Sequence, residues 1–291
     1  MRLKNKMAAK EFVILAEMLP PKGVDVSSIL ANAERVKHRI DAFVVPEMAN
    51  AVMKMSSLGG ALLLRVRGFE AIMQVCCRDR NRLAIQGDLL AAGAFGITHV
   101  MAVEGESISY GDHHLAKAAE DIDLPDLLRG IQSLQQGRDM AGVDLTGAPS
   151  FTVGSTVSAE LNGDGGGADL REIDARSALG AEFFVTQPIF DAAAFNTFMK
   201  RVGERKVKLI PTILLLKSLG MARYIDRNIK NVSIPAETLQ RIQQSPDKVQ
   251  ECVKIAAELI NALREQGCAG VLLSTIGWED KLGDILDKAK I

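Results

Sequence analysis

Polar residues recur at the points where short apolar runs of the sequence end. They are Glu17, Glu47, Gln74, Glu104, Glu106, Ser155, Ser158, Gln187, Ser274 and Thr275. Carboxyl groups from different strands with an amide between them suit proton transfer beside a bound cofactor. A carboxyl group that is partly removed from water can have its pKa raised towards the range of a general acid. Each acid could instead be a solvated loop residue or a helix cap, and this alternative has more weight for Glu47 than for Glu17.

The apolar runs themselves predict the strands of one parallel sheet. The runs are Glu11–Ala16, Asp41–Val45, Ile72–Cys76, Thr98–Val103, Ser150–Gly154, Glu182–Thr186, Lys208–Ile213 and Gly270–Ser274. They are continuously apolar rather than alternating, which is typical of strands buried on both faces. Eight strand–helix units without a break in composition predict an α/β fold, a single (β/α)8 TIM barrel over residues 1–291, with residues 1–10 as a flexible N-terminal segment. A doubly wound sheet is the alternative, but it would normally need fewer strands over this length.

Helix signals lie between these runs. Ser245-Pro246-Asp247 supplies an N-cap, a proline at the first helical position and an early acid, and Gly267 stands where a C-terminal glycine is expected. The segment Asp169–Leu179 shows the same pattern and ends at Gly180. Barrel enzymes carry their chemistry at the carboxyl ends of the strands, so the polar residues there are the candidate site.

Glycine and histidine clusters leave two interpretations open. The stretch Asn162–Gly167 either binds phosphate through backbone N–H groups ahead of a helix or forms a mobile lid. His113 and His114 could bind a metal, but no acid or cysteine has fitting spacing, so we favour a surface loop that lies against the cofactor. His99 precedes an apolar strand, and we expect it to be packed in the core.

Composition excludes several classes of function. The chain of 291 residues has a formal net charge of −1, which gives no electrostatic case for binding nucleic acid or an anionic membrane surface. We expect a soluble cytoplasmic protein, because no run approaches the ~18 apolar residues of a membrane span and the start lacks the apolar run of a signal peptide. The four cysteines lack the spacing of a metal site, and a disulfide framework is not expected.

Four motifs resemble those of a known family, the flavin-dependent methylenetetrahydrofolate reductases. A-E-M-L-P-P-K ends the first predicted strand and T-Q-P-I-F-D ends the sixth. D-A-F-V-V-P-E-M-A-N with M-S-S-L, and C-R-D-R-N-R-L-A-I-Q, resemble the branch found in anaerobic, acetogenic one-carbon metabolism. The likeness extends over essentially the whole chain, and the order and spacing of the motifs make it specific.

The resemblance implies roles for particular residues. Glu17 is similar to the family's general acid, which protonates a folate nitrogen, and Gln187 to the glutamine that orients folate and nicotinamide. Glu106 stands where the family has an aspartate that contacts the pterin near the flavin, and Met221 joins Glu106 and Gln187 in binding the substrate. The implied flavin-binding residues are Glu47, Ala49, Gln74, Glu104, Gly105, Glu106, Ser158, Asp169 and Arg176.

The same resemblance implies the reaction and its partners. We expect ping-pong reduction of methylenetetrahydrofolate to methyltetrahydrofolate with FAD, alternatively FMN, and with NADH or another reduced electron carrier as donor. It also implies an oligomer, and in this branch a small zinc-containing partner subunit and electron-transfer proteins. Two alternatives stay open: a folate-dependent methyltransferase barrel without a flavin, and a reductase subunit that is active only in a complex.

Several positions depart from the family pattern. Gln74 replaces a common histidine, Ser158 replaces a tyrosine that stacks on the isoalloxazine, and Trp278 replaces an arginine that contacts folate. Arg176 replaces a lysine, which keeps the charge but alters the geometry. Glu104 adds negative charge near the implied flavin, which should make the flavin harder to reduce.

Overall fold

The strands close into one parallel barrel in chain order. The computed structural model describes residues 2–159, 167–203, 205–229 and 231–291. The strands are β1 (Val13–Glu17), β2 (Ala42–Val45), β3 (Ala71–Cys76), β4 (His99–Val103), β5 (Thr152–Val157), β6 (Phe183–Pro188), β7 (Lys208–Leu214) and β8 (Gly270–Ser274). Each pairs in parallel with the next, and β8 pairs with β1, so the sheet has no open edge. The predicted barrel is confirmed and the doubly wound sheet is excluded. The strand positions agree with the prediction except at β5, which ends at Val157 rather than Gly154, so Ser155 lies within the strand and is buried.

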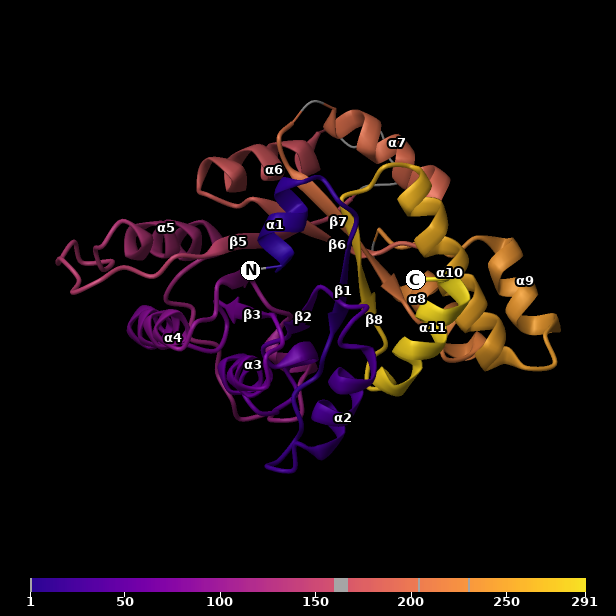
Figure 1. Cartoon of the computed structure of the whole chain (residues 1–291), viewed down its shortest axis with the longest axis horizontal. Helices are drawn as coiled ribbons and strands as arrows, with labels where there is room; N and C mark the ends of the chain where they lie inside the picture. Colours follow the sequence, from indigo (N-terminus) through magenta and orange to yellow (C-terminus); the bar gives the residue numbers. More distant parts are fainter. Residues whose placement is uncertain (1, 160–166, 204, 230) are drawn as a thin grey trace.

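Helices surround the barrel (Figure 1). They are α1 (Arg2–Ala8), α2 (Ser27–Val36), α3 (Ser57–Val66), α4 (Arg82–Ala94), α5 (Leu124–Gln135), α6 (Ala168–Ala178), α7 (Ala192–Val202), α8 (Leu219–Asn228), α9 (Ala236–Gln244), α10 (Lys248–Glu265) and α11 (Leu282–Ala289). Three short 3-10 turns complete the described elements: η1 (Ala49–Ala51), η2 (Ile108–Tyr110) and η3 (Glu279–Lys281). No helix of the described ranges has the length and apolar character needed to cross a membrane.

Two separate cores explain why the strands are apolar throughout. On β1, Val13 and Leu15 belong to the core inside the barrel, whereas Ile14 and Ala16 belong to the core between the barrel and the helices. This alternation follows from the two-residue period of a strand. Because both faces of the strands are largely buried, most strand residues are apolar, and polar residues within strands, such as Ser155 and Thr212, donate to backbone carbonyls of the neighbouring strands.

Helix α1 closes the amino end of the barrel, where we had expected a flexible segment. Leu3 and Met7 are one helical turn apart, and both side chains pack into the interior core. Lys6 forms an ion pair with Asp41 at 2.8 Å, and the Leu3 N–H donates to Glu70 at 3.0 Å. Figure 1 shows α1 lying across the ring of strands. The segment's short apolar stripe thus covers the end of the interior core, and the flexibility expected of residues 1–10 stays a prediction.

The predicted helix ends are confirmed with one shift. Gly180 and Gly267 follow α6 and α10 with φ of 94° and 79°, as C-terminal glycines do. The N-cap of α10 is Asp247, whose carboxylate accepts from the Gln250 N–H at 3.0 Å, and not Ser245. Ser245 instead ends the preceding helix α9, which the sequence pattern did not reveal.

Candidate active site

A cavity of about 340 Å³ opens at the carboxyl ends of β1 to β5. Its lining consists of Glu17, Pro46, Glu47, Ala49, Gln74, Val103, Glu104, Gly105, Glu106 and Thr156. The structure therefore gathers most of the predicted acid–base and cofactor residues around one space. Its volume is within the range of small-molecule sites, roughly 300–1,000 Å³.

The carboxyl group of Glu17 has a pKa in the range that suits a general acid. Glu17 is the last residue of β1 and is half-buried. The pKa of its carboxyl group is raised to about 7, first by burial and then by the negative charges of Glu279 and Glu106, against the hydrogen bond from Ser274 and the charge of Lys54. A carboxyl group with this pKa can hold a proton near neutral pH and release it to a substrate.

Glu47 is an anchor at the cavity wall. Its side chain is buried, and its Oε2 accepts from the Ser57 N–H at 2.9 Å, the Ser57 hydroxyl at 2.6 Å and the Arg80 guanidinium at 2.9 Å. These contacts join the end of β2 to the start of α3. The Glu47 N–H donates to Gln74 Oε1 at 3.2 Å, and this hydrogen bond fixes the orientation of the Gln74 amide. Glu47 is thus not a solvated loop acid; its carboxylate accepts from the free N–H of the first residue of α3, so it helps to cap this helix.

Arg78 joins two loops of the cavity, and sequence reasoning did not single it out. Its buried guanidinium donates to Met48 O and Glu106 O, both at 3.0 Å, and to both oxygens of Asp79 at 2.7 Å. Glu106 Oε2 lies 3.6 Å from Arg78 Nη1. The signal available in the sequence was the charged run Arg78-Asp79-Arg80, which closely follows a buried strand. Charged residues are rarely buried, so a run of them at the end of such a strand is unusual.

The backbone of the two loops is unusual as well. Gly105 has a φ of 86°, and a Cβ there would lie 2.4 Å from Cys76 Sγ, so only glycine allows the loop after β4 to pack on β3. Met48, Asn50 and Ala51 have positive φ values in the loop after β2. Strained residues of this kind persist only where the surroundings hold them, and the hydrogen bond from Arg78 to Met48 O is one such support.

Gln187 of β6 and Ser158, the residue after β5, are linked through Asn231 and lie outside the lining of the cavity. Gln187 Oε1 accepts from the Ala159 N–H at 2.8 Å, and its Nε2 donates to Ala159 O and to Asn231 O. Asn231 Nδ2 in turn donates to Ser158 Oγ at 3.0 Å. The amide of Gln187 therefore fastens the loop after β5 to the loop that contains Asn231.

The methylenetetrahydrofolate reductase family model matches residues 2–290. The chain belongs to this family. Among curated relatives, it is 25% identical over 245 residues to methylenetetrahydrofolate reductase 2 of Schizosaccharomyces pombe, with 79% of this chain and 37% of the relative covered. It is 23% identical over 304 residues to a probable methylenetetrahydrofolate reductase (NADPH) of Caenorhabditis elegans, covering 98% of this chain and 43% of the relative. The chain thus spans less than half the length of these relatives.

A solved structure shares the fold of this family member. It is an uncharacterized protein from Clostridium thermocellum that binds two copies of 5-methyl-5,6,7,8-tetrahydrofolic acid. The TM-score is 0.68 at 18% sequence identity, and the match covers 100% of this chain and 98% of the other.

The remaining residues implied by the family resemblance have contacts of their own. Asp169 at the start of α6 forms an ion pair with Arg201 of α7 at 3.0 Å. Arg176 pairs with Glu172 and donates to Thr156 O, at the edge of the cavity. Met221, in the first turn of α8, packs against the outer core. None of the three lines the cavity, and their roles in this family member stay predictions. Residues 162–166 of the predicted glycine-rich stretch lie outside the described residues.

The histidines of this family member lie where the sequence placed them. His113 and His114 are exposed in a surface loop, and His113 contacts Asp112, which also accepts from Lys22 and from the Met53 N–H. Contact of this loop with a cofactor stays a prediction. His99 is buried at the start of β4, and burial lowers its pKa to about 4, as expected of a neutral core residue.

Near β8, Trp278 stands at the position where the resemblance implies an arginine. The positive charge there comes from another residue, Lys217. The ammonium group of Lys217 lies 4.9 Å from the centroid of the Trp278 ring and donates to Ile276 O. Lys217 follows β7, so it reaches the position from the neighbouring strand.

Proposed function

We propose that this chain forms the catalytic barrel of a methylenetetrahydrofolate reductase, which reduces 5,10-methylenetetrahydrofolate to 5-methyltetrahydrofolate with a flavin. One observation carries the proposal: a carboxyl group with a pKa of about 7, Glu17, lies in a ligand-sized cavity at the carboxyl ends of the strands. Membership of the family supports it, as does the C. thermocellum protein, whose bound molecule would be the product of this reaction.

The residues of the cavity fit a polar ring system such as an isoalloxazine. Gln74 Oε1 is occupied by the Glu47 N–H, whereas its Nε2 has no partner among the described residues and can donate to a carbonyl or a ring nitrogen. In the proposed complex, Gln74 and the backbone of residues 104–106 would hold the ring, and Arg176 would pair with a phosphate. The flavin, FAD or alternatively FMN, would supply the hydride.

The protein's own contribution is acid catalysis and orientation. In its protonated form, Glu17 donates a proton to a folate nitrogen, which opens the methylene bridge to a reactive iminium carbon. The remaining carboxylate is tolerated because Ser274 and Lys54 offset part of its burial. Glu106 and Gln187 would orient the pterin, and Met221 would contact the rest of the substrate. Holding these groups in place lowers the entropic part of the barrier.

Gln187 would have to exchange partners to bind folate. Both ends of its amide are engaged with Ala159 and Asn231, so a contact with the pterin replaces one of these bonds. Such an exchange would couple substrate binding to the loop after β5 and to the loop between α8 and α9. The electron donor, NADH or another reduced carrier, belongs to the same proposal, as do the oligomer, the small zinc-containing partner subunit and the electron-transfer proteins.

The decisive experiment uses the purified chain. We expect a yellow protein with flavin absorbance, release of a cofactor with the mass of FAD or FMN, and oxidation of the reduced protein by methylenetetrahydrofolate under anaerobic conditions. A colourless protein that binds methyltetrahydrofolate would contradict the proposal and favour a folate-dependent methyltransferase. Turnover of the isolated chain with NADH would remove the need for partner proteins.

A further inference from the structure

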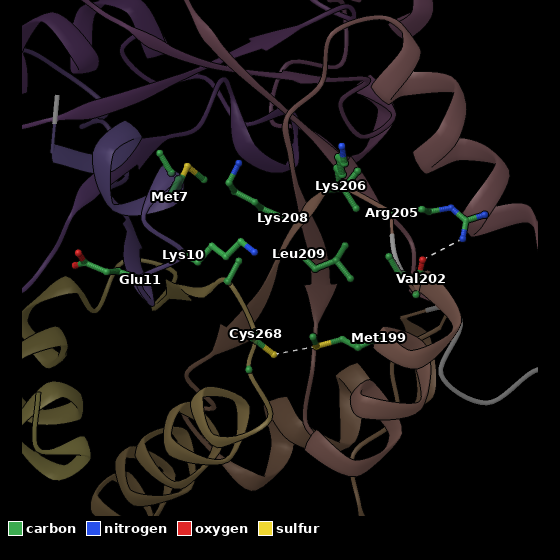
Figure 2. A pocket seen from close by; sticks show the side chains of 15 residues that line it. Met7, Lys10, Glu11, Met199, Val202, Arg205, Lys206, Lys208, Leu209 and Cys268 are labelled. Carbon is green, nitrogen blue, oxygen red and sulfur yellow. Dashed lines mark hydrogen bonds between the residues drawn. The ribbon is translucent and has the colours of Figure 1, made fainter.

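A second cavity lies at the opposite end of the barrel from the candidate active site (Figure 2). We name it the basal cavity. Its volume is about 650 Å³, and it is enclosed by α1, the end of α7 and the segments that lead into β1, β7 and β8. The residues that line it are Met7, Ala8, Lys10, Glu11, Met199, Val202, Gly203, Arg205, Lys206, Val207, Lys208, Leu209, Gly267, Cys268 and Ala269. The proposed reduction uses none of them.

The floor of the basal cavity is apolar. Met199 and Leu209 face it from α7 and β7, and Cys268 Sγ lies 3.2 Å from Met199 Sδ (Figure 2). Burial raises the pKa of the Cys268 thiol to about 12, so this thiol is neutral at physiological pH and reacts poorly. The floor therefore offers contact area to an apolar body but no charge.

The rim of the basal cavity is basic. Lys10, Lys206 and Lys208 form no ion pair with any residue in the described ranges, and Glu11 is the acid among the described lining residues. Arg205 is neutralised by Asp174, at 2.7 and 3.0 Å, and turns towards Val202 O. Figure 2 shows Lys10 extending towards Leu209 from the α1 side. Unpaired cations gathered around an apolar hollow repel one another and leave a positive field in it.

We propose that the basal cavity binds a small amphipathic organic anion, with its carboxylate, sulfonate or phosphate held by Lys10 and Lys208 and its apolar body resting on Met199 and Leu209. The volume is within the range of small-molecule sites, roughly 300–1,000 Å³, which are mostly apolar with a few polar groups that fix orientation. Lys208 is half-buried, so its charge is less screened by water than that of a surface lysine.

Such a ligand would connect parts of the chain that are far apart in sequence. Lys10 follows α1, whereas Lys208 begins β7 and Cys268 precedes β8. A bound anion would therefore fasten α1, which closes the barrel, to the amino ends of β7 and β8. This effect is independent of the reaction that the site performs.

The test uses 8-anilinonaphthalene-1-sulfonate as the probe, with binding followed by fluorescence and calorimetry on the full chain. We expect the double variant Lys10→Met/Lys208→Met to bind the probe about tenfold more weakly, which corresponds to about 1.4 kcal/mol. The control Lys288→Met/Lys290→Met removes the same charge from exposed positions on and after α11 and should bind the probe as the unaltered chain does. Uncharged N-phenyl-1-naphthylamine should bind more weakly than the sulfonate, and added salt should reduce the difference.

Protection of lysines from acetylation locates the probe. We expect it to protect Lys10 and Lys208 but not Lys54 or Lys217, which lie at the other end of the barrel. Equal affinity in the two double variants, equal binding of the uncharged compound, or protection of Lys54 instead would each overturn the proposal. So would a dimer that the Lys10→Met/Lys208→Met change dissociates, since the basal cavity would then be an interface between copies. The comparison of the two compounds and the salt dependence need only the unaltered chain, so the test holds even if a variant does not fold.

Discussion

At the scale of the residue, Glu17 combines a position at the end of β1 with a pKa of about 7. We predict that Glu17→Gln retains its cofactor but loses folate turnover by roughly 10²–10⁴-fold, the usual contribution of a general acid. Reduction of the flavin by its donor should change little, because that step does not use the proton. The two half-reactions can be followed separately by stopped-flow absorbance. Near-normal folate turnover in Glu17→Gln would remove Glu17 from its role.

The pKa of Glu17 also predicts a pH dependence. Only the protonated acid donates, so kcat/KM for folate should fall as the pH rises above about 7, and Glu17→Gln should lack this decline. The free energy of unfolding should also decrease as the pH rises. The folded pKa exceeds the ordinary value of 4.5 for a glutamate, so the contribution of Glu17 to stability is present below pH 4.5 and is lost as the pH rises through about 7. At pH 8, Glu17→Gln should therefore unfold at a higher urea concentration than the unaltered chain.

Glu104 is an exposed acid on the wall of the cavity, and its charge bears on the flavin potential. A unit charge near the ring, screened by water, changes the energy of reduction by about 1 kcal/mol, or about 20 mV for a two-electron couple. We predict that Glu104→Thr raises the midpoint potential by this amount in a spectroelectrochemical titration. Glu265→Thr, which removes an exposed acid at the end of α10, is the control. A midpoint that does not rise in Glu104→Thr defeats the hypothesis.

At the scale of the element, the cavity depends on how the loops after β2 and β4 are held. Arg78 is the shared support, since it donates to a carbonyl of each loop. We predict that Arg78→Lys weakens binding of methyltetrahydrofolate about tenfold, because an ammonium group cannot reproduce the planar fork that reaches both carbonyls. Each lost bond to a charged donor is worth roughly 1.5–3 kcal/mol. Isothermal titration calorimetry measures the change.

Arg82→Lys is the matched control for Arg78→Lys. Arg82 lies four residues further along the chain, at the start of α4, where it is exposed and pairs with Asp121 away from the cavity. An exposed ion pair contributes little, so this variant should bind folate normally. Equal affinities in the two variants would show that Arg78 does not organise the site.

At the same scale, the strands were predictable and the loops were not. Strands such as β4 are buried on both faces, so their apolar runs indicate them directly. The position of Glu17 in the cavity was predictable because strand ends in a barrel share one face, whereas its role as general acid stays a prediction. The anchoring of Glu47 by Ser57 and Arg80 was not, because it depends on contacts across three elements. The same holds for Gln187, whose partners Ala159 and Asn231 lie on separate loops.

At the scale of the whole molecule, the barrel has one end for chemistry and another that must be closed. The candidate active site occupies the carboxyl end, where polar residues interrupt the core. At the amino end, α1 inserts Leu3 and Met7 into the interior core. Sequence reasoning missed this helix because two apolar residues in a short basic segment form a weak pattern, and only the shape of the barrel end gives them a partner. The closing of the barrel end by α1 therefore depends on the folded barrel and cannot be predicted from the segment alone.

This division predicts that stability and catalysis can be separated. Leu3 is fully buried, and Leu→Ala changes in cores cost about 2–5 kcal/mol. We predict a loss at the lower end of this range, about 2 kcal/mol, for Leu3→Ala in urea unfolding, with folate turnover unchanged below the unfolding transition. Lys4→Ala, on the exposed side of the same helix, should be neutral. If Leu3→Ala instead left stability intact and reduced turnover, α1 would be coupled to the candidate active site through the interior core, and the two ends of the barrel would not be independent.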